Sequence, residues 1–464
     1  MNILKNNKQR SAFSIQHLAC RFQLSTFGFL PLAFSFLLLA LSFASVAQET
    51  VYPAQPQKGT FALTNATIHV GNGEVMNNGM VLVSNGKIVD VRPTAPIADV
   101  AVYDCKGQHI YPGLILASSQ LGLVEIGSVR ATVDASEIGN INSNIRSIVA
   151  YNTDSKAINV LRTNGILMAN VVPDGGLISG SSSVVQLDAW NWEDAAYATD
   201  NGIHFRMPSL LTRRGGGRGG FGAPQPAGDP IQRALAQIDE AKAFFREAKA
   251  YATNSKPINV NLKYEAVKGL YNKKQKLFIH CNIVKEMLIA IDFVKEFGFD
   301  VVIVGGSDSW MIAPMLKENN IAVILEQMHS LPTMMDDDVD QPYKTPFMLQ
   351  QAGVLFAIND ADGSTRFRNL AFNAGTAAAY GLTKEQALSA VTLNTAKILG
   401  IADKTGSIEK GKDANLVVSK GDILDMKGNI ISRAYIQGRE INLTDKHKQL
   451  SDRYEYKYGL GNKK

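Results

Sequence analysis

Two side chains, His280 and Asp360, stand where the active sites of α/β enzymes are commonly found. Each lies at or just after the end of a short apolar run, residues 277–280 and 354–358, of the length typical of a buried strand. Barrel enzymes place their sites at this end of their strands. An imidazole and a carboxylate there could bind a metal ion or exchange protons with a substrate. A hydrogen-bonded core histidine and an Asx turn at residues 360–363 are the structural alternatives.

The spacing of the other histidines does not suggest a metal site. No two are separated as H-x-H or H-x-x-x-H, the spacings that put two imidazoles on one face of a strand or helix. A catalytic zinc ion needs three protein ligands and an open position for water. Glu326 and His329 form one further potential ligand pair, after the apolar run 321–325. After residue 47 the sequence contains His69, expected to be structural, His447, expected to be solvated, and His109, His204, His280 and His329.

Apolar patterns predict the elements that position these side chains. Residues 60–110 and 406–442 contain short apolar runs of strand type, and Asn85-Gly86 between two of them is a strong hairpin signal. In the middle of the chain, apolar runs alternate with predicted helices, which is typical of a parallel sheet buried on both faces. Their number favours a (β/α) barrel over a small open sheet. The runs are residues 277–280, 301–304, 321–325 and 354–358.

Three helices are predicted with definite bounds or caps. Residues 284–297 have apolar side chains at helical spacing, and residues 346–352 are expected to form a second helix. Thr383 begins a third, because Gln386 three residues later completes a capping-box pattern.

Residues 1–47 have the features of a secretory signal peptide: a basic start, an apolar run and small residues before the expected cleavage point. We therefore expect an exported protein, periplasmic or secreted, with no stable membrane span after cleavage; an uncleaved anchor is the alternative. Cleavage removes four of the positive charges behind the formal net charge of +5, which leaves an almost neutral chain. Such a chain has no global electrostatic reason to bind nucleic acid. The two remaining cysteines, Cys105 and Cys281, are expected to be buried thiols.

A Gly/Arg-rich segment at residues 213–224 interrupts the barrel pattern. Its low complexity cannot contribute to a packed core. We expect a surface loop, and an Arg/Gly nucleic-acid-binding segment is the distant alternative.

Two motifs resemble the amidohydrolase superfamily. Tyr111-Pro112-Gly113-Leu114-Ile115 follows the N-terminal β region, and the stretch from residue 385 to residue 416 is similar to the imidazolonepropionase-related branch. The resemblance implies a (β/α)8 TIM-type barrel with a small β-sandwich built from both chain ends. It also implies metal-assisted hydrolysis of non-peptide C–N bonds, as in cyclic amides. For the parts of the chain, the resemblance implies sandwich segments at 58–111 and 404–442 and a barrel at 112–403, and the sequence itself predicts the signal peptide at 1–47 and a charged tail at 443–464.

The sequence departs from the family pattern at the metal ligands. Where the family has two histidines after its Pro-Gly motif, this chain has Ser118 and Gln120, which are poor zinc ligands. The next ligand position matches His280, and the one after it falls on Gly305. The family's catalytic aspartate, which accepts a proton from the metal-bound water, matches Asp360. The resemblance thus implies zinc or another divalent metal, while the substitutions predict a degenerate site, with no bound metal as the alternative.

Two hypotheses about function follow. The first is an exported hydrolase that acts on a small molecule through His280 and Asp360, with Glu326 or His329 replacing lost ligands. The second is a catalytically silent homologue that binds a ligand, or that associates with itself or with an intact amidohydrolase. The substitutions at Ser118, Gln120 and Gly305 favour the second hypothesis.

Overall fold

The computed structural model describes residues 52–211, 229–253, 259–326, 328–361, 363 and 365–460. All elements described below belong to the one compact unit that begins at Tyr52. The expected signal peptide at residues 1–47 and the Gly/Arg-rich segment at residues 213–224 lie outside the described residues. In the part of the chain that is described, no helix has the length and hydropathy needed to cross a membrane.

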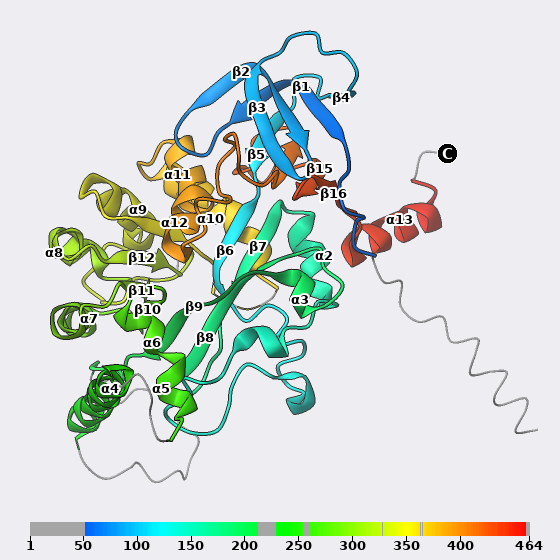
Figure 1. Ribbon diagram of the computed structural model, residues 1–464. Helices are drawn as coiled ribbons and strands as arrows, with labels where there is room; N and C mark the ends of the chain where they lie inside the picture. Colours follow the sequence, from blue (N-terminus) through cyan, green and yellow to red (C-terminus); the bar gives the residue numbers. More distant parts are fainter. Residues whose placement is uncertain are drawn as a thin grey trace, which may run out of the picture. The chain divides into compact units, whose positions relative to one another are not determined.

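The larger sheet is a nearly closed barrel of eight strands that follow one another in chain order (Figure 1). The TIM-type barrel expected from the sequence is therefore confirmed. Its strands are β6 (Leu114–Ser119), β7 (Ile166–Val171), β8 (Ile178–Gln186), β9 (Ala196–Arg206), β10 (Lys276–Cys281), β11 (Val301–Gly305), β12 (Ala322–Leu325) and β13 (Phe356–Ile358).

The parallel pattern is broken at β8, which runs antiparallel to both β7 and β9. The connections before and after β8, residues 172–177 and 187–195, are shorter than the crossover that a parallel pair requires. Gly175 and Gly176 adopt φ values of 84° and 67° in the first connection and reverse the chain there. All other neighbouring strands of the barrel are parallel.

Asn359 bridges the first and last strands of the barrel. Its side-chain Oδ1 accepts hydrogen bonds from the backbone N–H groups of Ala117 (3.0 Å) and Ser118 (3.2 Å), and its Nδ2 donates to the Ser118 carbonyl at 2.7 Å. A side-chain amide carries the same donors and acceptors as a peptide group. Asn359, one residue after β13, therefore supplies hydrogen bonds of the kind that a neighbouring strand would give to β6.

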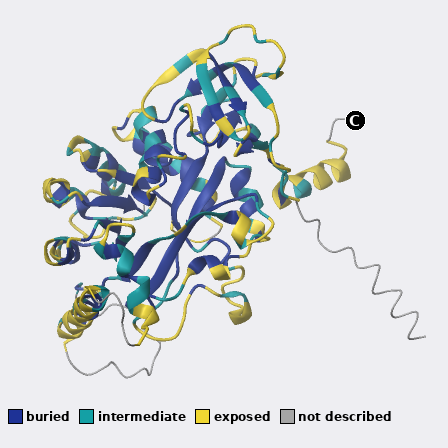
Figure 2. Ribbon diagram, in the orientation of Figure 1, coloured by how far each residue is buried: buried dark blue, intermediate teal, exposed yellow. Residues whose placement is uncertain are grey.

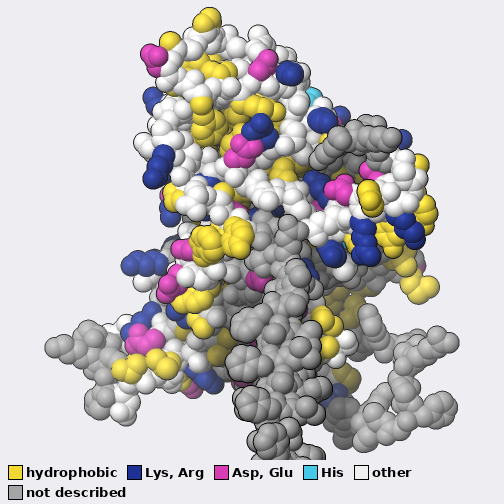
Figure 3. Space-filling view, turned by 90° about the vertical axis from the view of Figure 1, so that its right-hand side faces the viewer, with side chains coloured by type: hydrophobic (Ala, Val, Ile, Leu, Met, Phe, Trp, Pro, Cys, Tyr) yellow, Lys and Arg dark blue, Asp and Glu magenta, His cyan; other side chains and the backbone are white. Residues whose placement is uncertain are grey.

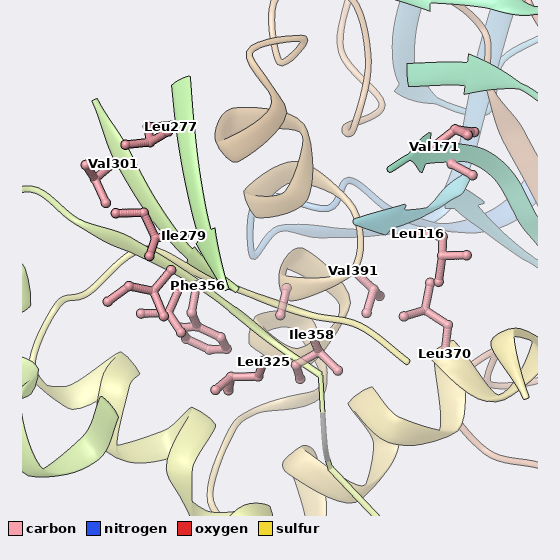
Figure 4. Close-up of a cluster of buried hydrophobic side chains, with 14 of the residues drawn as sticks. Leu116, Val171, Leu277, Ile279, Val301, Leu325, Phe356, Ile358, Leu370 and Val391 are labelled. Atoms are coloured by element: carbon pink, nitrogen blue, oxygen red, sulfur yellow. The ribbon is translucent and has the colours of Figure 1, made fainter. Parts of the chain in front are cut away.

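Helices cover the outside of the barrel, and α4, α7, α8 and α9 lie along the outer side of strands β10–β12 (Figure 1). Most residues of the barrel strands are buried and the outer helix faces are exposed (Figure 2). Figure 4 shows strand side chains such as Leu277, Ile279 and Phe356 within the core, with Leu370 and Val391 from the helical region. The helices are α2 (Lys156–Arg162), α3 (Trp192–Ala195), α4 (Pro230–Thr253), α5 (Leu262–Ala266), α6 (Lys268–Tyr271), α7 (Val284–Phe297), α8 (Ala313–Glu318), α9 (Gln341–Gln351), α10 (Leu370–Ala379), α11 (Lys384–Ala390), α12 (Leu393–Leu399) and α13 (Lys446–Tyr458).

A second sheet combines strands from both ends of the chain, as the resemblance implied. In it β5 pairs with β1 from the N-terminal side and with β14 from the C-terminal side. This sheet has its own apolar core, which includes Leu63, Ile110 and Leu416. Its strands are β1 (Thr60–His69), β2 (Val75–Ser84), β3 (Lys87–Pro93), β4 (Ala101–Asp104), β5 (His109–Pro112), β14 (Leu416–Ser419), β15 (Ile431–Ile436) and β16 (Arg439–Glu440).

Most local predictions agree with the structure. Helix α7 has the predicted bounds, the hairpin turn falls at Asn85-Gly86, and Thr383 and Gln386 form both hydrogen bonds of the capping box. Cys105 and Cys281 are buried free thiols. Helix α9 begins at Gln341 rather than at residue 346, because a proline in its first turn suits a helix start.

Candidate functional site

A pocket of about 300 Å³ opens among the C-terminal ends of the barrel strands. Three residues singled out from the sequence, Ser118, Gln120 and His280, line it together, and Gly305 does not. We call it the mouth pocket. Its lining consists of Ser118, Ser119, Gln120, Val124, Val172, Asp174, Arg206, His280, Glu326, Ala361, Gly363 and Phe367.

The two neutral side chains at the first ligand positions are held by protein partners. Gln120 donates from Nε2 to Asp174 Oδ2 at 2.9 Å. The Ser118 backbone is held by Asn359, and its side chain hydrogen-bonds the Glu326 carboxyl group. Strand β6 is fully buried, which holds these residues in place at the pocket wall.

Gly305, at the third lost ligand position, cannot be replaced by a residue with a side chain without a shift of its surroundings. It pairs with Cys281 across the β10–β11 ladder and has a φ of 103°. A Cβ atom built on it would lie 2.5 Å from Asn282 Oδ1 and 3.0 Å from the Cys281 carbonyl oxygen. A histidine at this position would therefore be strained by the positive φ and would require Asn282 to shift. Gly305 lines a separate, much smaller cavity beside the mouth pocket.

His280 is bound to a second histidine that the sequence reasoning did not single out. His280 Nε2 lies 2.9 Å from Nδ1 of His204, which comes from β9, is fully buried and stacks on Phe278. Burial, with a further contribution from Arg206, lowers the pKa of both imidazoles well below their usual value. Both rings are therefore neutral at pH 7, and His280 already uses one ring nitrogen for a protein contact.

Glu326 lines the mouth pocket, but His329 does not join it there. Burial raises the Glu326 pKa to about 7, although Ser118 and Arg206 act in the opposite direction. The His329 ring is exposed, bonds Thr376 Oγ1 at 2.8 Å and therefore contacts α10. The potential ligand pair Glu326/His329 is thus not formed.

Asp360 lies beside the pocket and is buried. Its Oδ2 accepts a hydrogen bond from Asn373 Nδ2 at 3.2 Å, and the next residue, Ala361, lines the pocket. The predicted proton-handling carboxylate therefore lies at the expected end of the barrel, near Glu326, whose pKa it helps to raise.

Arg206 and Asp174 are pocket residues that the sequence analysis missed. Arg206 Nε lies 2.7 Å from Asp174 Oδ1, and both side chains are partly exposed. Arg206 ends β9 and Asp174 follows β7, so the antiparallel strand between them brings the two together. The sequence signal for β9 was weak: a short run, Ile203-His204-Phe205, precedes Arg206 and indicates the end of a buried strand.

The donor groups at the barrel mouth do not fit a resident metal ion. Across the described residues, no three or more His, Cys, Asp or Glu side chains are placed to hold one. At the positions where the resemblance implies ligands, Ser118 offers a hydroxyl, Gln120 an amide and Gly305 no side chain, and His280 is paired with His204. Such a set lacks the three nitrogen, sulfur or carboxylate ligands of a catalytic zinc site.

Comparison with known sequences gives a consistent match. A sequence model described as "Amidohydrolase family" matches residues 327–441. Amidohydrolase tasK of Hapsidospora irregularis is 20% identical over 405 residues, 81% of this chain and 41% of that protein. Imidazolonepropionase of Flavobacterium johnsoniae is 37% identical over 82 residues, 17% of this chain and 20% of that protein. The chain thus spans less than half the length of the curated relatives it matches.

Solved structures agree on the fold. An amidohydrolase from Thermotoga maritima MSB8 has a TM-score of 0.71 and 26% sequence identity, and the match covers 82% of this chain and 99% of that one. A putative prolidase from Bifidobacterium longum has a TM-score of 0.52 at 17% identity, with 86% and 100% of the two chains covered. The second similarity concerns the fold alone.

Proposed function

This chain belongs to the amidohydrolase superfamily, and we propose that it acts there as a ligand-binding homologue without a resident metal ion. In this proposal the mouth pocket binds a small polar molecule, and metal-assisted hydrolysis of a C–N bond does not take place in it. The observation that carries the proposal is the lining of the mouth pocket: Ser118 and Gln120, at positions where the resemblance implies metal ligands, line it with His280, and Gly305, at the third such position, lines a different cavity.

The charges and donors of the mouth pocket indicate the kind of ligand. Arg206 offers guanidinium N–H groups beyond the Nε that faces Asp174, and Gln120 and Ser118 add neutral polar groups. Val124, Val172 and Phe367 form the apolar part of the wall. A small molecule with a carbonyl or carboxylate acceptor next to an apolar portion is compatible with this lining.

Metal analysis of the purified chain tests the proposal directly. We expect far less than one equivalent of zinc, iron or manganese per chain, because the site lacks three ligands. An intact amidohydrolase purified in the same way is the control. One tightly held equivalent that is lost in both His280→Ala and Asp360→Asn would contradict the proposal and support the metal-dependent hydrolase of the first hypothesis.

A metal-independent hydrolase is the second candidate, favoured by the Glu326 carboxyl group with its pKa of about 7. As general base, Glu326 would take a proton from water while the water oxygen attacks a substrate carbonyl carbon. The C–N bond would then break, and the leaving nitrogen would receive the proton. Turnover of cyclic amides that rises with pH around 7 and disappears in Glu326→Gln would support it; no turnover in the unmodified chain would exclude it.

We also propose that the chain is exported and that it associates with a partner protein. The sequence of residues 1–47 supports export to the periplasm or medium, where a partner could be a second copy or an intact amidohydrolase. Cell fractionation with detection of the mature N-terminus tests export, and light scattering of the purified mature chain tests self-association.

A further inference from the structure

A second pocket, of about 490 Å³, lies at the seam between the sheet domain and the barrel. Its walls come from the segment before β1, the β2–β3 turn, the barrel segment 186–194 and the C-terminal strands. We call it the seam pocket. It shares no lining residue with the mouth pocket. In Figure 1, β16 and α3 lie toward the side that Figure 3 presents, where hydrophobic side chains lie among charged ones.

The floor of the seam pocket is a buried network of charged side chains that contact one another. Asp188 accepts hydrogen bonds from Arg162 Nη1 at 2.5 Å and from the Ala54 backbone N–H at 2.9 Å. Arg439 donates to Gln186 Oε1 at 3.0 Å and to the Asp188 carbonyl at 3.2 Å. These bonds join three distant chain segments, so the floor is rigid before any ligand arrives.

The charged side chains at the pocket leave little net charge for an ionic ligand. Lys87 Nζ contacts Asp413 Oδ1 at 2.5 Å, and Asp413 Oδ2 accepts a hydrogen bond from the Tyr197 hydroxyl. Arg439 lies 3.7 Å from Asp188. Both cations of the lining, Lys87 and Arg439, thus face a carboxylate already, which disfavours an anion as ligand.

The rim, in contrast, carries polar side chains that make no hydrogen bond within the described residues. The amide groups of Asn85 and Gln437 and the carboxylate of Asp194 are exposed and line the pocket. Asn85 and Gln437 both occupy turn positions with φ values of 48°, and both turns lie at the edge of the pocket. Two amides and a carboxylate offer donors and acceptors side by side, the mixture that hydroxyl groups require.

An exposed aromatic ring completes the rim. Trp190 is 59% exposed, and Tyr52 lies beside it with ring centroids 6.2 Å apart. Tryptophan is a largely buried residue in most proteins, so a large exposed indole in a pocket wall indicates a contact surface. The flat ring provides an apolar face next to the hydrogen-bonding groups of the rim.

We propose that the seam pocket binds a neutral saccharide, with one sugar ring lying on Trp190 and its hydroxyl groups bonded to Asn85, Asp194 and Gln437. A sugar ring has an apolar C–H face and a polar edge. The aromatic face of Trp190 suits the C–H face, and the unpaired polar groups of the rim suit the hydroxyl groups. The neutral charge of the sugar agrees with the pairing of Lys87 and Arg439, and the unpaired Asp194 carboxylate can accept hydrogen bonds from its hydroxyl groups. This site is independent of the mouth pocket and of the function proposed for it.

Fluorine NMR of the full mature chain labelled with fluorotryptophan tests the proposal. The chain has three tryptophans, and the resonance missing from Trp190→Phe identifies the one at the pocket. We expect maltose, cellobiose or diacetylchitobiose at about 10 mM to shift the Trp190 resonance and to leave that of Trp310 unchanged. Asp194→Ala should weaken the binding about tenfold, whereas Tyr456→Ala, an exposed aromatic on α13, should not change it.

Three results would overturn the proposal. One is a Trp190 resonance that no saccharide shifts at this concentration, with circular dichroism showing that the labelled chain is folded. Another is a shift produced by a short neutral peptide or by a basic tripeptide but not by sugars, which would assign the pocket to a peptide. A saccharide-induced shift that is unchanged in Asp194→Ala and Asn85→Ala would place the sugar elsewhere and would also contradict the proposal.

Discussion

The mouth pocket and the seam pocket differ in where their unpaired polar groups lie. At the mouth, side chains at functional positions are bonded to each other: Gln120 to Asp174, and His280 to His204. At the seam pocket, the charged side chains of the floor are bonded to each other, and the polar side chains of the rim make no hydrogen bond within the described residues. The comparison shows that side chains at the barrel mouth can be bonded to protein partners and so be unavailable to a metal ion. A pocket between two domains can keep unpaired polar groups at its rim.

The largest effect is expected at the seam floor. Asp188→Ala would leave Arg162, whose side chain is 4% exposed, without its carboxylate. Loss of one partner of a buried pair should lower the free energy of unfolding by about 3–5 kcal/mol. Chemical denaturation measures it, with Lys384→Ala at the exposed Lys384–Asp422 pair as a control that should cost below about 1 kcal/mol. Equal losses of unfolding free energy in the two variants would show that the buried Arg162–Asp188 pair matters no more to stability than an exposed pair does.

At the mouth, Gly305→Ala tests whether the backbone excludes a side chain. The contact of the new Cβ with Asn282 and the positive φ should together cost about 2–4 kcal/mol. Gly298→Ala is the matched control, because Gly298 has a φ of 73° but no atom near its Cβ position. It should cost only about 1 kcal/mol. If the two losses are similar, a side chain at position 305 is tolerated and the ligand position could be restored.

A smaller effect is expected for the bridge between β6 and β13. Asn359→Ala removes the hydrogen bonds to Ala117 and Ser118 and should cost about 1–3 kcal/mol. Asn164, whose amide donates to Val160 in the preceding turn, gives a control variant, Asn164→Ala, with a loss of less than about 1 kcal/mol. Faster hydrogen exchange of the Ala117 and Ser118 amides should accompany the first variant only. Unchanged exchange would mean that other contacts close the barrel.

The smallest effect is the pH dependence at Glu326. Its pKa is raised to about 7, so its contribution to stability is present at low pH and is lost as the pH rises through about 7. The unmodified chain should therefore lose about 1–2 kcal/mol more than Glu326→Gln between pH 5 and pH 8, less than a fully buried group would give. Denaturation at both pH values measures the difference. Identical pH dependence in both chains would show that Glu326 is ionised throughout.

Part of the mouth pocket was predictable because its residues follow strands that local patterns reveal. Ser118, Gln120 and His280 could be placed together from motif position and strand ends, and the structure brings them together. His204 and Arg206 could not, because β9 has a polar first half and belongs to the antiparallel unit around β8. The seam pocket was out of reach, since its lining joins segments from both ends of the chain.

The sequence by itself determined the barrel, the hairpin at Asn85-Gly86 and the bounds of α7, because apolar period and turn residues are local properties. Only the tertiary structure decided that His280 pairs with His204, that Asn359 bridges the barrel and that the seam leaves Asp194 free. Hydrogen-bond partners distant in the chain depend on strand direction and on the packing of two domains, which no short stretch of sequence specifies.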